Sequence, residues 1–376
     1  MFKLVNDGQK NQNTILLLFH KTLSKTDGQV NYLKTLISAL KPEYKIMLPS
    51  EELFSQYSLN NKSWLLRVLL LNILLSKYLI KNRVKLKQGL KYVIIEDRYL
   101  PFPAYLSRLF LKKPMIYHVS DWGIEYAKSL RFGIPLLKPL YVAFSYQYQI
   151  SVTRHANAVI IPSEHLINGI YPHMTGKVAV FPYVPLLSNP EPLSEWSELG
   201  WVNLNYTVNC VFLGNFNYKP NIDAARFIIQ KIAPTILNID PDVLFLVVGT
   251  KGDEIFTKKP LPNVLCTGFI EDITSLLKKC HIGLNLSIAR GGTSIKNIDY
   301  IVNGLFVIST PEAAEGVIRS DMLTIVKQDN FSEVIVSIVK QIRKGYSVDK
   351  HEVQRVRNYY SFERNKEKII DFLKTI

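Results

Sequence analysis

Short apolar runs separated by helical patterns recur along almost the whole chain, and this alternation constrains the fold more than any other feature. In the first half, the runs lie at 14–19, 44–48, 92–95, 115–118, 158–161 and 178–181. Strands that are apolar throughout and alternate with helices are typical of a parallel sheet covered on both faces. The first half therefore predicts a Rossmann-like, doubly wound α/β domain.

The alternation restarts in the second half after a segment rich in proline and polar residues, 186–205. Apolar runs then follow at 210–213, 243–248, 264–267, 282–286, 305–309 and 323–326. A length of 376 residues also suits two domains. We predict two Rossmann-like domains facing each other across a cleft, at 1–187 and 207–360, joined by a linker at 188–206. An amphipathic C-terminal helix at 361–376 is expected to return toward the first domain.

The net charge of this chain is +15, and the excess of positive charge lies mostly in the first half. No acidic residue lies between Glu52 and Glu96, a stretch that contains many lysines and arginines. Such a patch attracts polyanions, namely an acidic membrane surface, nucleic acid or phosphorylated substrates. The most apolar segment, Trp64–Ile80, lies within it and is too short and too charged to span a bilayer. This segment predicts either a helix buried against the sheet or one resting on acidic lipid headgroups.

The cysteines and the N-terminal residues indicate a compartment. The three cysteines, Cys210, Cys266 and Cys280, form no C-x-x-C pair, so we expect buried thiols in a reducing compartment and no metal site. The first residues, MFKLVNDGQKNQ, lack the apolar core of a secretory signal. We therefore expect a cytoplasmic protein whose basic half can attach peripherally to the inner face of the cell membrane.

Several segments of the second half, at or after the ends of its apolar runs, are rich in polar residues and glycine. They lie at 211–225, 247–249, 268–272, 287–299 and 303–316. Glycines let the backbone approach a phosphate, and free amides at a helix start point toward it. Thr293 and Ser294 add hydroxyl donors, whereas Arg290 and Lys296 supply cations that neutralise a diphosphate. The alternative for a single glycine turn of this kind is a capped helix with a surface ion pair.

These segments resemble the C-terminal half of the retaining glycosyltransferases of GT-B fold, family 4 (group 1). The likeness covers 209–316 and is greatest to the subgroup whose second domain opens with F-x-G-x-x-x-Y-x-P-N. It implies a nucleotide-diphosphate-sugar donor, no cofactor and no metal, with Arg290 and Lys296 as catalytic cations. Asp299 takes the place of the acidic residue that binds the ribose hydroxyls. The implied donor-binding residues are Gly214, Asn215, Lys219, Gly291, Gly292, Thr293, Ser294, Asp299 and Glu315.

The sequence departs from the family pattern at positions that matter for catalysis. Gly291 stands where members usually carry a glutamate, and it can offer an amide but no carboxylate. Asn215 replaces the usual arginine and leaves Lys219 as the nearby cation. Asp299 replaces a second glutamate and is one methylene shorter.

The first half contributes candidates for the acceptor side of the site. His118 ends an apolar run near Asp121, and a histidine at this place in the family often contacts the transferred sugar. Ser163 follows the next run, and Gly28 stands where members have a paired-glycine loop near the acceptor. The structural alternatives are a hydrogen-bonded histidine at a strand end, a helix N-cap and a tight turn.

Together these features predict a retaining, metal-independent glycosyltransferase. It would move a sugar from a UDP- or GDP-sugar to a hydroxyl of a lipid-linked or polysaccharide acceptor, in cell-envelope, lipopolysaccharide or exopolysaccharide assembly. Two alternatives stay open: a non-catalytic GT-B descendant that binds nucleotide or glycan, and a sugar epimerase of the same fold, which needs no acceptor. Charge alone suggests nucleic acid, but the sequence offers no recognition helix or stacking motif, so we expect no such partner.

Overall fold

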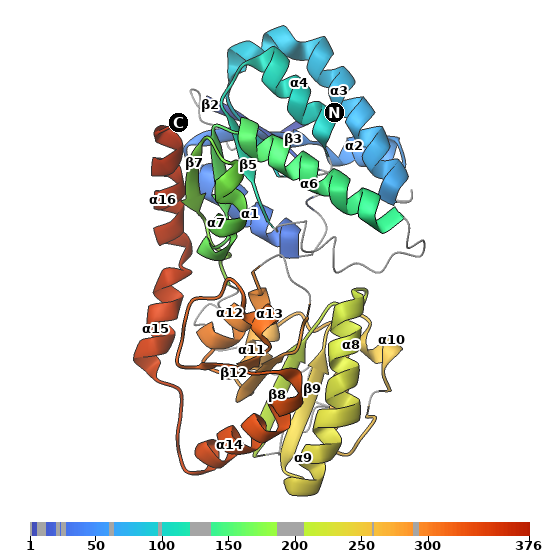
Figure 1. Ribbon diagram of the computed structural model, residues 1–376, viewed down its shortest axis with the longest axis vertical. Helices are drawn as coiled ribbons and strands as arrows, with labels where there is room; N and C mark the ends of the chain where they lie inside the picture. The colour runs from blue at the N-terminus through green and yellow to red at the C-terminus, as the bar shows by residue number, and fades with distance from the viewer. Residues whose placement is uncertain are drawn as a thin grey trace. The chain divides into compact units, whose positions relative to one another are not determined.

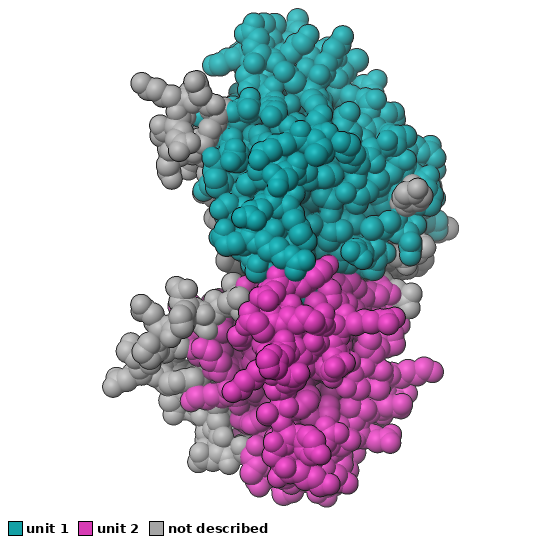
Figure 2. All heavy atoms as spheres, turned by 90° about the vertical axis from the view of Figure 1, so that its left-hand side faces the viewer, with its two compact units in different colours: residues 1–184, 360–376 teal, residues 185–359 magenta. Residues whose placement is uncertain are grey.

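The chain forms two compact units, which are shown in different colours in Figure 2. The computed structural model describes residues 2–5, 13–19, 23, 28–59, 64–96, 100–120, 137–185, 207–257, 259–288 and 293–376. Unit 1 comprises Met1–Val184 and Tyr360–Ile376, and unit 2 comprises Pro185–Tyr359. The linker predicted at 188–206 lies outside the described residues.

Unit 1 is built on a seven-stranded sheet with the order β1-β3-β2-β4-β5-β6-β7. Its strands are β1 (Phe2–Val5), β2 (Asn13–Leu18), β3 (Tyr44–Pro49), β4 (Leu90–Ile95), β5 (Met115–His118), β6 (Ala158–Ile161) and β7 (Lys177–Val180). β1 pairs antiparallel with β3, and the other neighbours pair in parallel. The predicted apolar runs are therefore strands, and β1 is an edge strand that the sequence analysis missed.

Helices cover both faces of this sheet (Figure 1). They are α1 (Gly28–Leu40), α2 (Glu51–Gln56), α3 (Trp64–Gly89), α4 (Pro101–Leu111), α6 (Leu137–His155), α7 (Ile167–Ile170) and α16 (Phe362–Lys374). α3, α4 and α6 share one hydrophobic core with the sheet. The C-terminal helix α16 returns to this unit, where Tyr92 Oη donates to Leu373 O (2.7 Å) and Lys177 Nζ donates to Thr375 O (2.6 Å).

The two interpretations of the apolar basic segment describe opposite faces of the same helix, α3. One face, with Leu71, Leu75 and Leu79, is fully buried against the sheet. The opposite face carries an exposed apolar stripe at helical spacing, formed by Leu66, Leu69, Ile73, Ile80 and Val84. Among the residues that the structure describes, no helix is both long and apolar enough to cross a membrane.

Unit 2 contains a six-stranded sheet with the order β10-β9-β8-β11-β12-β13, and all its strands are parallel. The strands are β8 (Val208–Leu213), β9 (Val243–Val248), β10 (Val264–Thr267), β11 (Ile282–Asn285), β12 (Phe306–Ser309) and β13 (Leu323–Ile325). The three cysteines are free and buried in this unit, as predicted.

The helices of unit 2 include a long one that is interrupted by a π-helical turn. They are α8 (Lys219–Phe227), the π-turn (Ile228–Ile232), α9 (Ala233–Ile239), α10 (Gly252–Ile255), α11 (Ile273–Leu277), α12 (Ile295–Val302), α13 (Pro311–Ala314), α14 (Phe331–Arg343) and α15 (Lys350–Tyr359). α12 packs closely on the sheet because Gly283 has no side chain: a Cβ there would lie 2.3 Å from the Tyr300 ring. Tyr300 Oη in turn accepts a hydrogen bond from the Leu213 amide (2.8 Å).

The strand order of each sheet reverses next to its first parallel strand. In unit 1 the chain passes from β2 to β3 on one side and later to β4 on the other. In unit 2 the same reversal separates β8 from β11. Ligands of doubly wound sheets bind at the carboxyl ends of the strands at such a point, so these two edges are where a site is expected.

Candidate functional site

The carboxyl ends of the central strands of unit 2 approach each other through glycines. Gly249, which follows β9, has a φ of +144°, and a Cβ on it would lie 1.7 Å from Gly214 O. Gly214 follows β8 and donates its amide to Val248 O (2.9 Å). The Gly249 amide donates to Gly268 O after β10 (3.2 Å). Side chains are therefore absent at three neighbouring strand ends, and the segments after these strands pack closely: a Cβ on Gly214 would lie 3.1 Å from the Phe216 ring, and one on Gly268 would lie 2.9 Å from the Asp253 carboxylate.

Lys296 brings a positive charge to the same edge. It lies in the first turn of α12, and its Nζ donates to Asn221 Oδ1 of α8 (2.8 Å). The same atom lies 4.4 Å from the centroid of the Phe212 ring, near the end of β8. Burial lowers the pKa of Lys296 to about 7 because desolvation disfavours the charged form. An anion bound nearby would favour the ammonium form again.

The start of α12 offers hydrogen-bond donors beside this lysine. Ser294 is the N-cap residue, yet its side chain makes no capping hydrogen bond; its Oγ accepts from Asn285 Nδ2 (2.6 Å) instead. Thr293 Oγ1 is buried and has no hydrogen-bond partner among the described residues. Because the first amides of a helix lack intrahelical acceptors, this helix start can bind an anion.

A buried polar network that the sequence analysis missed holds α12 in place. Asn285, at the end of β11, and Asn297 of α12 are both completely buried. Asn285 Nδ2 donates to Asn297 Oδ1 (3.0 Å), and Asn297 Nδ2 donates to Ser309 Oγ (3.0 Å) and Ala313 O (2.8 Å). The available signal was an asparagine at the end of an apolar run and another on the apolar face of a helix. Buried polar networks of this kind rigidify the groups around them.

The other residues predicted to bind the sugar donor are more exposed than Lys296 or only partly buried. Lys219 Nζ pairs with Asp223 Oδ1 at 2.6 Å, and both side chains are about half exposed. Asn215 is exposed, and its backbone oxygen accepts from Asn221 Nδ2 (3.0 Å). Asp299 is partly buried one turn after Lys296 on α12.

The remaining residues predicted to bind the sugar donor lie at the end of α13 and in the segment before α12. Glu315 directly follows α13 and is partly buried. Arg290, Gly291 and Gly292 lie outside the described residues. Their roles in donor binding and catalysis stay predictions.

His118 occupies the corresponding edge of unit 1. It ends β5, is completely buried, and is hydrogen-bonded through Nδ1 to Glu96, which follows β4. Its ring stacks on Tyr32 of α1, with 4.6 Å between the centroids. Its Nε2 is also buried and has no hydrogen-bond partner among the described residues. Its contact with a sugar stays a prediction.

The other acceptor-side candidates are placed differently. Ser163 precedes a short 3₁₀ turn, and its Oγ is hydrogen-bonded to His165 Nδ1 and makes no cap to the turn. Burial lowers the pKa of His165, which favours the neutral ring. Gly28 is the first residue of α1. Asp121 lies outside the described residues.

The Glu96–His118 contact leads to a stability prediction. We expect Glu96→Ala to lower the free energy of unfolding by about 1–3 kcal/mol, because it leaves a buried imidazole nitrogen without its partner. Glu96→Gln keeps an acceptor oxygen and should cost less. Urea denaturation of both variants measures the difference, and equal losses would show that the hydrogen bond is not the cause.

Comparisons with known proteins agree with this architecture. The family model described as "Glycosyl transferases group 1" matches residues 207–343, within unit 2. The sucrose-phosphate synthase of Thermosynechococcus elongatus matches with a TM-score of 0.68 and 13% identity, over 97% of this chain and 99% of that one. Anabaena Alr3699/HepE in complex with UDP and glucose matches with a TM-score of 0.68 and 14% identity, over 97% and 100% of the two chains.

A curated relative matches over a shorter stretch. The Klebsiella pneumoniae protein described as "Uncharacterized 44.6 kDa protein in cps region" is 23% identical over 120 residues, which are 30% of this chain. The match spans 31% of that relative's own length. These comparisons and the two doubly wound units show that the chain has the GT-B fold, and that its residues 207–343 match the glycosyl transferases group 1 model. Its assignment to family 4 stays a prediction.

Proposed function

We propose that the protein transfers a sugar from a UDP- or GDP-sugar to a hydroxyl of a lipid-linked or polysaccharide acceptor. The observation that carries this proposal is Lys296, a lysine of lowered pKa at the start of α12 beside the side-chain-free end of β8. The HepE structure holds UDP and glucose, and a relative comes from a cps region. Both support a donor of this class and a role in glycan assembly.

Departure of the nucleoside diphosphate is the step that these residues would assist. The bond from the anomeric carbon to the diphosphate oxygen breaks, and negative charge accumulates on that oxygen. The Lys296 ammonium, the amides at the start of α12 and the Ser294 and Thr293 hydroxyls stabilise this charge. Asp299 accepts hydrogen bonds from the ribose. Transfer proceeds with retention and without a metal ion, as the resemblance to family 4 implies; chelator treatment and the anomeric configuration of the product test these two points.

A thermal-shift panel of UDP, GDP, ADP and CMP on wild type and Asp299→Ala tests the donor site. A nucleotide at about 100 times its dissociation constant stabilises the folded state by about 2.7 kcal/mol, which raises Tm by several degrees. We expect one diphosphate to shift wild type and to shift the variant less. No shift with any nucleotide would contradict the proposal.

Turnover assays separate the enzymatic alternatives. Release of the nucleoside diphosphate with transfer to an acceptor is the proposed reaction. Binding without release would indicate a non-catalytic descendant. Consumption of the donor without an acceptor, giving an altered sugar, would indicate an epimerase.

Phe269 is a candidate for stacking against the nucleotide base. It follows Gly268 at the carboxyl edge of the sheet, and 71% of its surface is exposed. Aromatic stacking on a base contributes about 1–3 kcal/mol, so Phe269→Ala should weaken binding of the diphosphate by about 5- to 150-fold. Titration calorimetry measures this, and Phe269→Tyr should retain most of the affinity. An unchanged affinity for Phe269→Ala would exclude the stacking role.

We also propose that unit 1 attaches to an acidic membrane surface through α3. The exposed stripe of this helix is apolar, and the helix contains Lys77, Lys81 and Lys85 but no acidic residue. Each lysine near a surface of anionic lipids contributes about 1 kcal/mol to the free energy of binding, and salt weakens this attraction. Lys81→Glu combined with Lys85→Glu should lower binding to phosphatidylglycerol vesicles at least about tenfold. Sedimentation with these vesicles measures the effect, and salt-independent binding would contradict it.

A further inference from the structure

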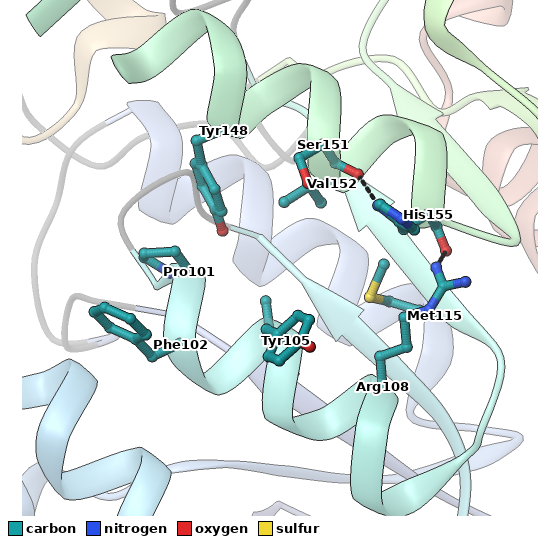
Figure 3. Close-up of a pocket in the computed structure, with 10 residues that line it drawn as sticks. Pro101, Phe102, Tyr105, Arg108, Met115, Tyr148, Ser151, Val152 and His155 are labelled. Carbon is teal, nitrogen blue, oxygen red and sulfur yellow. Dashed lines mark hydrogen bonds between the residues drawn. The ribbon is translucent and has the colours of Figure 1, made fainter.

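A pocket in unit 1 lies between α4 and α6, and none of its lining residues is assigned to catalysis or donor binding. Its volume is about 420 Å³, within the usual range for small-molecule sites. Figure 3 shows α4 and α6 on its two sides, with Met115 of β5 between them. The lining residues are Pro101, Phe102, Ala104, Tyr105, Arg108, Met115, Tyr148, Ser151, Val152 and His155.

The polarity of this pocket changes from one end to the other (Figure 3). Pro101 and Phe102 of α4 lie at the apolar end with Tyr148 of α6. Arg108 and His155 lie at the opposite end, where Arg108 Nη1 donates to His155 O (2.5 Å). The remaining guanidinium N–H groups can serve a further acceptor, since Arg carries five donors.

Residues next to the pocket follow the same change from apolar to polar. At the apolar end, Phe144 lies one turn before Tyr148 on α6 and is 62% exposed. On α4, Phe102 and Tyr105 are 63% and 67% exposed. Large apolar groups on the surface mark interaction sites when they gather in one patch.

The charges of both helices favour an anion. Neither α4 nor α6 contains an aspartate or glutamate. Lys112 directly follows α4, and Arg154 precedes His155 at the end of α6. The basic end of the pocket therefore lies in a region of positive charge.

From these observations we infer that the α4–α6 pocket binds one anionic phospholipid, with its acyl chain along the apolar end and its phosphate on Arg108. Arg is well suited to a phosphate because two parallel N–H groups can reach two oxygens. The site rests on the membrane association proposed above and adds a specific lipid contact to it. It does not depend on the donor site in unit 2.

Titration of the full-length protein with dihexanoyl phosphatidylglycerol, kept monomeric, tests the pocket without a bilayer. We expect saturable binding to wild type, weaker binding of dihexanoyl phosphatidylcholine and none of inorganic phosphate alone. Ser151→Trp fills the pocket from an exposed position and should abolish binding. Arg108→Gln should weaken it about tenfold or more and reduce the preference for the anionic lipid.

A variant on α3 is the matched control. Arg83 also donates to a backbone carbonyl, Ile80 O (3.2 Å). Arg83→Gln should bind the monomeric lipid as wild type does. If Ser151→Trp does not fold, Tyr105→Ser replaces it, with the same expected loss.

Three outcomes would overturn the lipid site. They are absence of binding to wild type, equal binding of phosphate alone, and unchanged binding by folded Ser151→Trp. Vesicle binding without binding of the monomeric lipid would leave the α3 attachment in place and remove the pocket. Arg108→Gln could instead lower Tm without changing lipid affinity. Arg108 would then serve only to neutralise the partial negative charge at the C-terminus of α6, and its assignment to the phosphate would be wrong.

Discussion

Replacing Lys296 by glutamine is expected to lower turnover of the sugar donor by about 10²–10³-fold, the usual loss when one preorganised donor to a developing negative charge is removed. The lysine lies at the start of α12, where its Nζ contacts Asn221 and Phe212. Because burial lowers its pKa to about 7, the residue costs stability when it is charged. The variant should therefore be at least as stable as wild type, so a loss of activity cannot be attributed to unfolding.

The same pKa gives the wild type a pH dependence that the variant lacks. A bound diphosphate stabilises the ammonium, so the pKa of Lys296 rises on binding and a proton is taken up. Nucleotide affinity should fall as pH rises above about 7, by at most about tenfold per pH unit. Calorimetry in buffers of different ionisation enthalpy measures the uptake.

The control for this experiment is Lys278→Gln, which removes an exposed lysine of the same unit. It should leave turnover, affinity and their pH dependence unchanged. If Lys296→Gln keeps full activity, or if its affinity follows the wild-type pH profile, Lys296 does not contact the diphosphate.

Gly249→Ala should be the most destabilising single substitution that we predict, at about 3 kcal/mol or more. Its φ of +144° is unfavourable for any side chain, and the new Cβ would lie 1.7 Å from Gly214 O. The two strand ends would have to separate, which disturbs the edge where we place the donor. Urea denaturation should show the loss in stability, and any folded protein should bind nucleotide more weakly.

Gly345→Ala separates the backbone contribution from the steric one. Gly345 also has a positive φ, of +86°, but a Cβ there would meet nothing within 4 Å. Gly345→Ala should lower the free energy of unfolding by only about 1 kcal/mol, which is the cost of placing a side chain on left-handed backbone. Equal losses for the two variants would mean that the contact with Gly214 has no effect.

Strand positions could be predicted well because the signal is local. In a parallel sheet covered on both faces, each strand is an uninterrupted apolar run, and β9, β10 and β5 have the predicted bounds. β1 was missed because it forms a strand by pairing with β3, and a contact between segments so far apart in the sequence leaves no local signal. α3 was ambiguous because an apolar stripe looks the same in sequence whether it faces the core or the solvent.

The sequence by itself determined the fold class, the order of the glycine-rich segments and the excess of positive charge, since periodicity, glycine content and charge are properties of neighbouring residues. The tertiary structure alone decided which polar groups meet. Lys296 reaches Asn221 across 75 positions, and His118 reaches Glu96 across 22. Arg108 likewise reaches His155 across 47, at one end of the pocket between α4 and α6. Such contacts depend on strand register and helix packing, which the whole core sets at once.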